Sequence, residues 1–157
     1  MKSIEMNKAK LLLSTIFLIL SSGYSGFGQN RIGADLKQLI ENRSYFIAKN
    51  FFTDTRLQAS IIEQTPKNEV GRLIISFEKH RNCKSESIKR LNKKLISNST
   101  TTYYIITYKN ITTCGKFVYV VVHKVINNSY TYDSTYVLDQ NGYKEKFERI
   151  INIYRND

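Results

Sequence analysis

Residues 116–139, KFVYVVVHKVINNSYTYDSTYVLD, hold two runs of β-branched and aromatic residues on either side of an Asn127-Asn128 pair. Val, Ile, Tyr and Thr favour strands, and Asn tolerates the positive φ of a two-residue hairpin turn. The stretch therefore predicts a β-hairpin. A similar run precedes it, and Asn141-Gly142 is a second tight-turn pair after it. We expect a meander of four antiparallel strands over residues 102–109, 116–126, 130–139 and 144–154.

Two helices are expected ahead of this meander. In residues 34–49, Leu36, Ile40 and Ile47 recur at helical spacing, with an acidic residue near the start. Residues 85–96 begin with a serine suited to cap a helix and carry an apolar stripe at helical spacing. The sequence therefore predicts a helix over each range.

The segment between these two helices is less regular. In residues 71–79, Leu73, Ile75 and Phe77 alternate with other residues, which predicts a strand. Residues 55–64 fit either a strand or a helix, because their apolar positions match both periods. The expected order is therefore a helix, one or two strands, a second helix and four strands.

This order predicts an α+β fold with helices packed on one face of a curved antiparallel sheet of roughly four to six strands. It resembles the cystatin-like and nuclear-transport-factor-two-like cone folds, in which a long helix lies in the hollow of a bent sheet. Members of that group serve as enzymes, ligand carriers and interaction modules. The resemblance therefore implies a shape but assigns no functional residues.

The first thirty residues resemble a bacterial secretory signal peptide of the kind found in Bacteroidota. Three lysines precede an apolar run over residues 11–20, and small residues follow as far as Gly26-Phe27-Gly28. The apolar run is about half the roughly 20 residues that a membrane-spanning helix needs. We expect residues 1–28 to be removed, with cleavage at Gly28 or a few residues earlier, which leaves residues 29–157 as one secreted or periplasmic domain. An uncleaved anchor is the alternative.

The chain is strongly basic, with a formal net charge of +11 over 157 residues. Residues 1–28 hold only three lysines and one glutamate, so their removal would leave the domain basic. A basic protein favours anionic partners, and we expect a small anion or an acidic protein rather than nucleic acid. The densest basic stretch, residues 79–94, suits a solvated surface. No phosphate-binding loop or metal-ligand motif is present, and we expect no cofactor and no metal.

Cys83 and Cys114 form the only cysteine pair, and an oxidising compartment permits a disulfide bond between them. Such a bond would contribute about 3–4 kcal/mol to stability in the chain-entropy description. A zinc site that adds His80 and His123 is the alternative. We favour the disulfide, because zinc thiolate sites mostly contain tightly spaced ligand pairs.

The two tight turns fix a register for the last three expected strands. This register places one largely apolar face toward the helices and leaves the opposite face to solvent. Polar groups on the apolar face predict a ligand pocket in which Arg149 holds an anion and His123 and tyrosines supply donors. The pocket candidates are Tyr119, His123, Tyr132, Ser134, Tyr136 and Arg149. In the alternative reading, Arg149 reaches solvent and His123 is a structural core residue.

The sequence therefore predicts a small exported binding or accessory domain that holds a small ligand or a protein partner on its curved sheet. We expect no enzymatic activity. The alternative is a small secreted ribonuclease-like hydrolase with Glu78, His80 and His123 as acid–base residues and an arginine for the phosphate. That chemistry requires the two histidines to share one site.

Overall fold

The computed structural model describes residues 32–157, so the predicted signal peptide over residues 1–28 lies outside the described residues. The elements are α2 (Ala34–Asn50), α3 (Thr55–Gln64), α4 (Lys67–His80), β1 (Ser85–Ser97), β2 (Thr102–Thr112), β3 (Gly115–Ile126), β4 (Ser129–Asp139) and α5 (Tyr143–Arg155). The α+β class is confirmed. The element order is not the expected one, because three helices precede the four strands of this range and another helix follows them.

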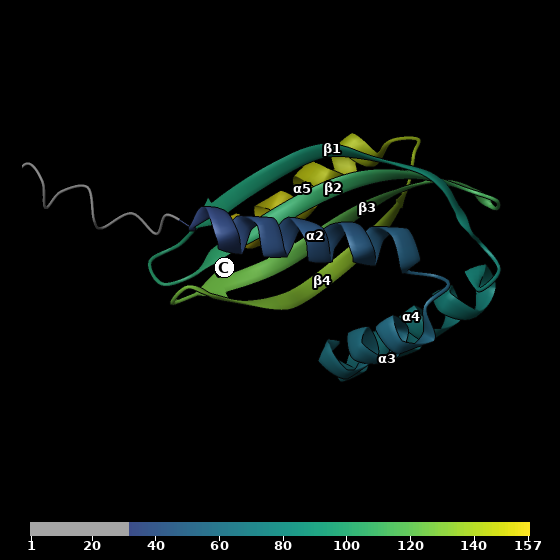
Figure 1. Ribbon diagram of the computed structural model, residues 1–157, viewed down its shortest axis with the longest axis horizontal. Coiled ribbons are helices and arrows are strands. Elements are labelled where there is room, and N and C mark those ends of the chain that lie inside the picture. Colours follow the sequence, from purple (N-terminus) through teal and green to yellow (C-terminus); the bar gives the residue numbers. More distant parts are fainter. Residues whose placement is uncertain (1–31) are drawn as a thin grey trace, which may run out of the picture. The chain divides into compact units, whose positions relative to one another are not determined.

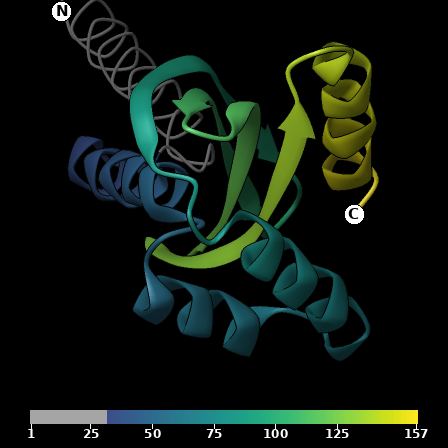
Figure 2. The same ribbon diagram turned by 90° about the vertical axis from the view of Figure 1, so that its right-hand side faces the viewer.

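The four strands form an antiparallel meander in the order β1-β2-β3-β4. The predicted turn between β3 and β4 is present, with Asn127 and Asn128 at φ values of 49° and 58°. Figure 1 shows the curved sheet with α2 lying along one face and α5 behind the other. In the side view of Figure 2, α2 and α5 lie on opposite sides of the strands. The sheet is therefore covered on both faces.

Each face of the sheet has its own apolar core. One core joins α2, α3 and α4 to alternate residues of the strands, among them Ile106, Tyr119 and Val121. The second core joins α5 to the intervening residues, such as Ile105 and Val120. The prediction that the second face meets solvent is wrong, because α5 covers it.

The segment predicted as a strand over residues 71–79 is helix α4. Its isoleucines and leucine satisfy both a period of two and a helical period, and Pro66 stands at the N-cap, where a proline is tolerated. Of the α4 side chains, only Phe77 is buried, whereas Ile75 is 66% exposed. The adjacent residues 55–64 are also helical, and Asp54 caps this helix by accepting hydrogen bonds from Arg56 N and Leu57 N.

The segment predicted as a helix over residues 85–96 is the edge strand β1. Ile88 and Leu95 lie on the same face of the sheet, although they are an odd number of residues apart. Leu91 is left without a partner between two paired residues, and this bulge shifts the alternation by one. A bulged strand thus produced an apolar spacing that mimics a helix.

The segment predicted as the last strand, residues 144–154, is helix α5. Phe147, Ile150, Ile151 and Tyr154 are its buried residues, and they recur at helical spacing. Gly142 does have a positive φ, as the turn prediction required, but it leads into a helix rather than back into the sheet. The sequence therefore carries the helical pattern, and the prediction of a strand here is wrong.

The predicted register between β3 and β4 holds only close to their turn. His123 pairs with Tyr132, as a two-residue turn at Asn127-Asn128 requires, but Val122 pairs with Ser134 rather than with Asp133. The extra residue, Asp133, forms a β-bulge. Because side chains alternate between faces, this one-residue shift moves Ser134 and Tyr136 to the α5 side of the sheet.

Candidate ligand-binding cleft

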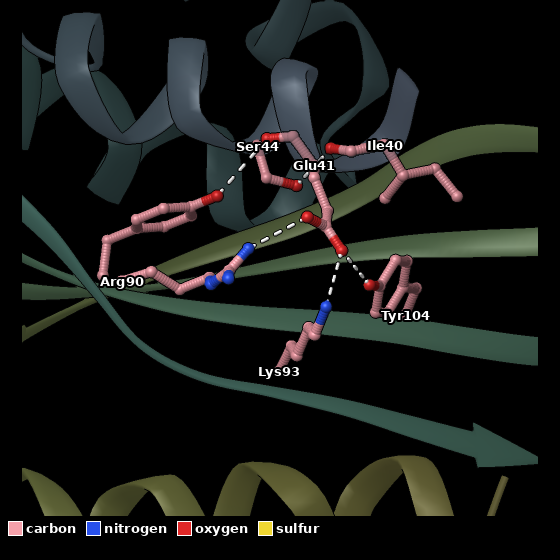
Figure 3. Close-up of polar contacts among 7 residues, drawn as sticks. Ile40, Glu41, Ser44, Arg90, Lys93 and Tyr104 are labelled. Atoms are coloured by element: carbon pink, nitrogen blue, oxygen red, sulfur yellow. Dashed lines mark hydrogen bonds and ion pairs between the residues drawn. The ribbon is translucent and has the colours of Figure 1, made fainter. Parts of the chain in front are cut away.

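Helix α2 is fixed across the sheet by the carboxylate of Glu41, as Figure 3 shows. Glu41 Oε1 accepts hydrogen bonds from Tyr104 Oη at 2.6 Å and Lys93 Nζ at 3.0 Å. Glu41 Oε2 accepts from Arg90 Nη1 at 2.9 Å. The hydrogen bond from Tyr104 is the largest cause that lowers the pKa of Glu41, and the two cations act in the same direction. One carboxylate thus joins α2 to β1 and β2.

The rest of α2 is held by hydrogen bonds to backbone oxygens. Asn110 Nδ2 donates to Ala48 O at 3.0 Å, and this buried contact ties β2 to the C-terminal half of the helix. Tyr108 Oη donates to Glu41 O at 3.3 Å. These contacts fix the rotation of α2, which decides where its remaining side chains lie.

Two residues beyond Glu41, Arg43 lines a cleft of about 470 Å³ that includes residues of β3, β4 and the end of α3. Its lining residues are Arg43, Gln64, His123, Tyr130, Thr131 and Tyr132. The α2 and α3 side chains bring a guanidinium and an amide, and the strands bring an imidazole and two phenols. The cleft therefore combines aromatic walls with several hydrogen-bond donors.

His123 forms the floor of this cleft and is completely buried. The rings of Tyr130 and Tyr132 meet it edge to face, with centroids 5.6 Å and 6.1 Å away. Within the described residues, neither ring nitrogen has a partner that meets hydrogen-bond geometry, although a polar contact with the Thr131 backbone raises the pKa of the ring. A buried polar group without a partner is costly, so this imidazole needs an explanation.

Burial lowers the pKa of His123 from 6.5 to about 4, and the positive charge of Arg43 adds to the shift. The ring is therefore neutral at physiological pH, with one nitrogen available as donor and the other as acceptor. Burial also raises the pKa of Tyr132 to about 12, so its hydroxyl stays protonated. The cleft thus presents the Arg43 charge beside neutral aromatic groups.

The Arg43 guanidinium lies over the ring of the exposed Phe46, 5.7 Å from its centroid. None of the ion pairs among residues 32–157 involves Arg43. The guanidinium is always charged and presents a planar set of donors. It is therefore able to accept an anion without first breaking an internal salt bridge.

The structure brings together only part of the predicted pocket. His123 and Tyr132 line the cleft, whereas Tyr119 lies on the same face but packs against Phe51, with ring centroids 5.8 Å apart. Arg149 lies on α5, exposed to solvent and paired with Glu145. Arg43 supplies the cationic group of the cleft instead. No motif or spacing in the sequence points to this residue.

Ser134 and Tyr136, the other two pocket candidates, belong to a hydroxyl network on the α5 side of the sheet. Tyr154 Oη donates to Asp133 Oδ2 at 2.8 Å and lies 2.6 Å from Ser134 Oγ. Tyr136 Oη lies 3.2 Å from the same Tyr154 oxygen. This network joins α5 to the bulge of β4 and explains these polar side chains structurally.

The residues of the hydrolase alternative do not share one site. His80 stacks on Phe52 at 4.6 Å between ring centroids and meets Phe117 edge to face at 5.4 Å. His123 is six residues farther along β3 than Phe117, which corresponds to roughly 20 Å along a strand. Glu78 is exposed on α4. The geometry therefore does not place the two histidines as an acid–base pair.

The predicted disulfide between Cys83 and Cys114 is present, with a Cα–Cα distance of 5.3 Å. Lys84 N donates to Thr113 Oγ1 and Thr113 N donates to Lys84 O, both at 3.0 Å, beside the bond. The bond thus joins the end of α4 to the turn between β2 and β3. It occupies both sulfur ligands of the zinc alternative.

A comparison with known protein families, with curated proteins and with solved structures finds no match for the chain. No helix within residues 32–157 has the length and hydropathy of a membrane-spanning segment. Assignment of a function therefore depends on the chemistry of the cleft.

Proposed function

We propose that this protein is an exported, non-enzymatic binding domain that holds a small, compact anion in the cleft between α2, α3 and β4. Export is supported by the disulfide, which is typical of oxidising compartments, and by the leader-like residues 1–28. The observation that carries the ligand proposal is the pairing of Arg43 with the buried, unpartnered His123 in one open cleft.

Arg43 is the group that would hold the anion. Its guanidinium is suited to carboxylate or phosphate oxygens, because it donates two parallel hydrogen bonds. Gln64, at the end of α3, supplies an amide that can donate to a second oxygen of the ligand. Tyr130 and Tyr132 line the same cleft, whose volume is about 470 Å³, and we expect it to take a compact anion.

His123 would respond to the ligand through its charge. An anion beside Arg43 cancels the repulsion that helps to keep the imidazole neutral, which makes protonation of the ring easier. Binding should therefore raise the pKa of His123, and by linkage the anion should bind more tightly as the pH falls toward 5. If no anion binds beside Arg43, the pKa of His123 will not change with the anion.

Calorimetric titration of the secreted protein with phosphate, sulfate and citrate at pH 5.5 tests the proposal. We expect saturable binding of at least one anion, weakened about tenfold or more in Arg43→Gln, because a charged hydrogen-bonding partner is lost. Arg149→Gln is the matched control, since Arg149 is exposed on α5, and it should bind as the wild type does. Equal binding by wild type and Arg43→Gln would refute the proposal.

A further inference from the structure

A second cleft, of about 430 Å³, lies on the opposite side of the sheet between β1, β2 and the first turns of α5. Its lining residues are Leu91, Asn92, Thr107, Tyr143, Lys144, Phe147 and Glu148. Side chains of Leu91, Tyr143 and Phe147 provide an apolar surface. Lys144 and Glu148 are exposed at the rim.

Thr107 is the unexplained residue in this cleft. It is 2% exposed, and its Oγ1 has no hydrogen-bond partner within the described residues. Its neighbours on this face, Ile105 and Val120, belong to the apolar core under α5. A valine in place of Thr107 would extend that core without leaving a buried hydroxyl unpaired. Packing therefore does not account for the hydroxyl.

The strand opposite Thr107 is irregular at the same place. Thr107 pairs with Asn92, and the bulged residue Leu91 lies between Asn92 and the next paired residue of β1. Bulges bend a strand and redirect side chains, and they are frequent beside binding sites. Here the bulge brings Leu91 into the lining of the cleft, where it is 38% exposed.

The charges around this cleft favour an anion. Lys89 and Lys109 face each other across β1 and β2, and alternation puts Lys109 on the same face as Thr107. Like charges directly opposite each other are unfavourable. None of the ion pairs among residues 32–157 involves Lys89, Lys109 or Lys144, and Glu148 is the acidic residue that lines the cleft. Among the lining residues Lys144 and Glu148 cancel, so the nearby Lys89 and Lys109 supply the positive charge that favours an anionic ligand.

We infer that this cleft binds a small amphipathic monocarboxylate, with its apolar body against Leu91 and Phe147 and its carboxylate accepting a hydrogen bond from Thr107. Lys144 lies at the rim, and Lys109 is two residues from Thr107 on the same face of β2, so both can attract the carboxylate by their charge. The site is separate from the Arg43 cleft, because it lies on the other face of the sheet. Its ligand also differs, since the Arg43 cleft suits a compact anion without an apolar body.

Titration of methyl-labelled protein with benzoate and with hexanoate tests the inference by NMR. We expect saturable shifts of the Leu91 and Thr107 methyl signals with at least one carboxylate. Benzyl alcohol and hexanol, which keep the apolar body without the charge, should bind about tenfold more weakly. Carboxylate shifts confined to the Arg43 cleft, or absent from Leu91, would overturn the inference.

Calorimetry on Thr107→Val separates a ligand contact from a structural role. This variant should unfold at a temperature no lower than that of the wild type, because it removes an unpaired buried hydroxyl, yet bind the carboxylate about tenfold more weakly. Thr131→Val, the same change in the other cleft, should bind the carboxylate as the wild type does. Unchanged affinity of Thr107→Val would contradict the inference. Arg43→Gln should retain this binding, so the two sites can fail independently.

Discussion

Arg43 on α2 and His123 on β3 line the same cleft, and the guanidinium helps to keep the buried imidazole neutral. Neither residue is near the other in the sequence. Arg43 and His123 come together because of the rotation of α2 about its axis. The hydrogen bonds of Glu41 to Tyr104 and of Asn110 to the Ala48 carbonyl oxygen fix this rotation. The cleft is therefore a product of how α2 is anchored.

Acidification should destabilise the fold through His123. The pKa of the ring is about 4 in the folded protein and 6.5 as its ordinary value, so the unfolded state takes up the proton first. The free energy of unfolding is therefore unaffected by protonation of His123 above pH 6.5. Between pH 6.5 and about pH 4 it falls by about 3 kcal/mol, which corresponds to the difference between the two pKa values. Urea unfolding of wild type and His123→Leu across this range measures the difference. A parallel pH dependence in the two proteins would contradict the assignment.

The Glu41 carboxylate should matter for stability at neutral pH. Glu41→Gln should lower the free energy of unfolding by about 1–3 kcal/mol, because Tyr104, Lys93 and Arg90 lose a charged partner. Because the pKa of Glu41 is lowered in the folded protein, its ionised carboxylate stabilises the fold at pH values above its ordinary pKa of 4.5. This stabilisation is lost as the pH falls through the pKa of Glu41 in the folded protein. The difference in the free energy of unfolding between Glu41→Gln and the wild type should therefore become smaller at acidic pH.

Glu145→Gln is the matched control for that experiment. Glu145 pairs with Arg149, but both side chains are 75% exposed. Exposed pairs contribute little to stability. A loss in Glu145→Gln as large as that in Glu41→Gln would show that general surface charge, rather than the Glu41 contacts, explains the result.

How much of the fold was predictable varies by element. Residues 34–49, 102–109, 116–126 and 130–139 combine a clear period with identifiable caps or turns, and the structure confirms them. Residues 71–79 satisfied two periods at once, so the sequence alone could not decide between them. Residues 144–154 carry a helical pattern, but the preceding Asn141-Gly142 pair is equally typical of a hairpin turn, so the two local signals conflict.

The two β-bulges are the main reason that the candidate site could not be predicted in full from the sequence. A bulge is a single unpaired residue, and nothing in the local sequence marked Leu91 or Asp133 as one. The bulge at Asp133 moved Ser134 and Tyr136 away from His123. The role of Arg43 could not be predicted for another reason. Its place in the cleft depends on the tertiary contacts of α2 and not on spacing along the chain.

The polar network on the α5 side should stabilise the docking of the last helix. Tyr154→Phe removes the hydroxyl that joins Asp133, Ser134 and Tyr136. We expect a loss of about 1–3 kcal/mol, since the half-buried Asp133 carboxylate loses one of its donors while the ring still fills its place. Chemical denaturation measures this loss. Tyr143→Phe is the control, because the Tyr143 hydroxyl takes no part in this network. Equal stability of the two variants would argue against the network.

The disulfide should hold the end of α4 to the sheet. Replacement of both Cys83 and Cys114 by serine should cost about 3–4 kcal/mol, because the unfolded chain gains the freedom that the bond removes. Calorimetric melting of the oxidised, the reduced and the doubly substituted proteins makes the comparison. Two free thiols in the native protein would contradict the disulfide, and with it the evidence for an oxidising compartment.

The most direct test of the proposed function is the pKa of His123 itself, measured from the ring nitrogen signals by NMR with and without a bound anion. The account predicts that phosphate, sulfate or citrate raises this pKa from about 4 by about one unit in the wild type, and leaves it unchanged in Arg43→Gln. A His123 pKa that stays at its unliganded value when these anions are present in excess would contradict the claim that the Arg43 cleft binds an anion.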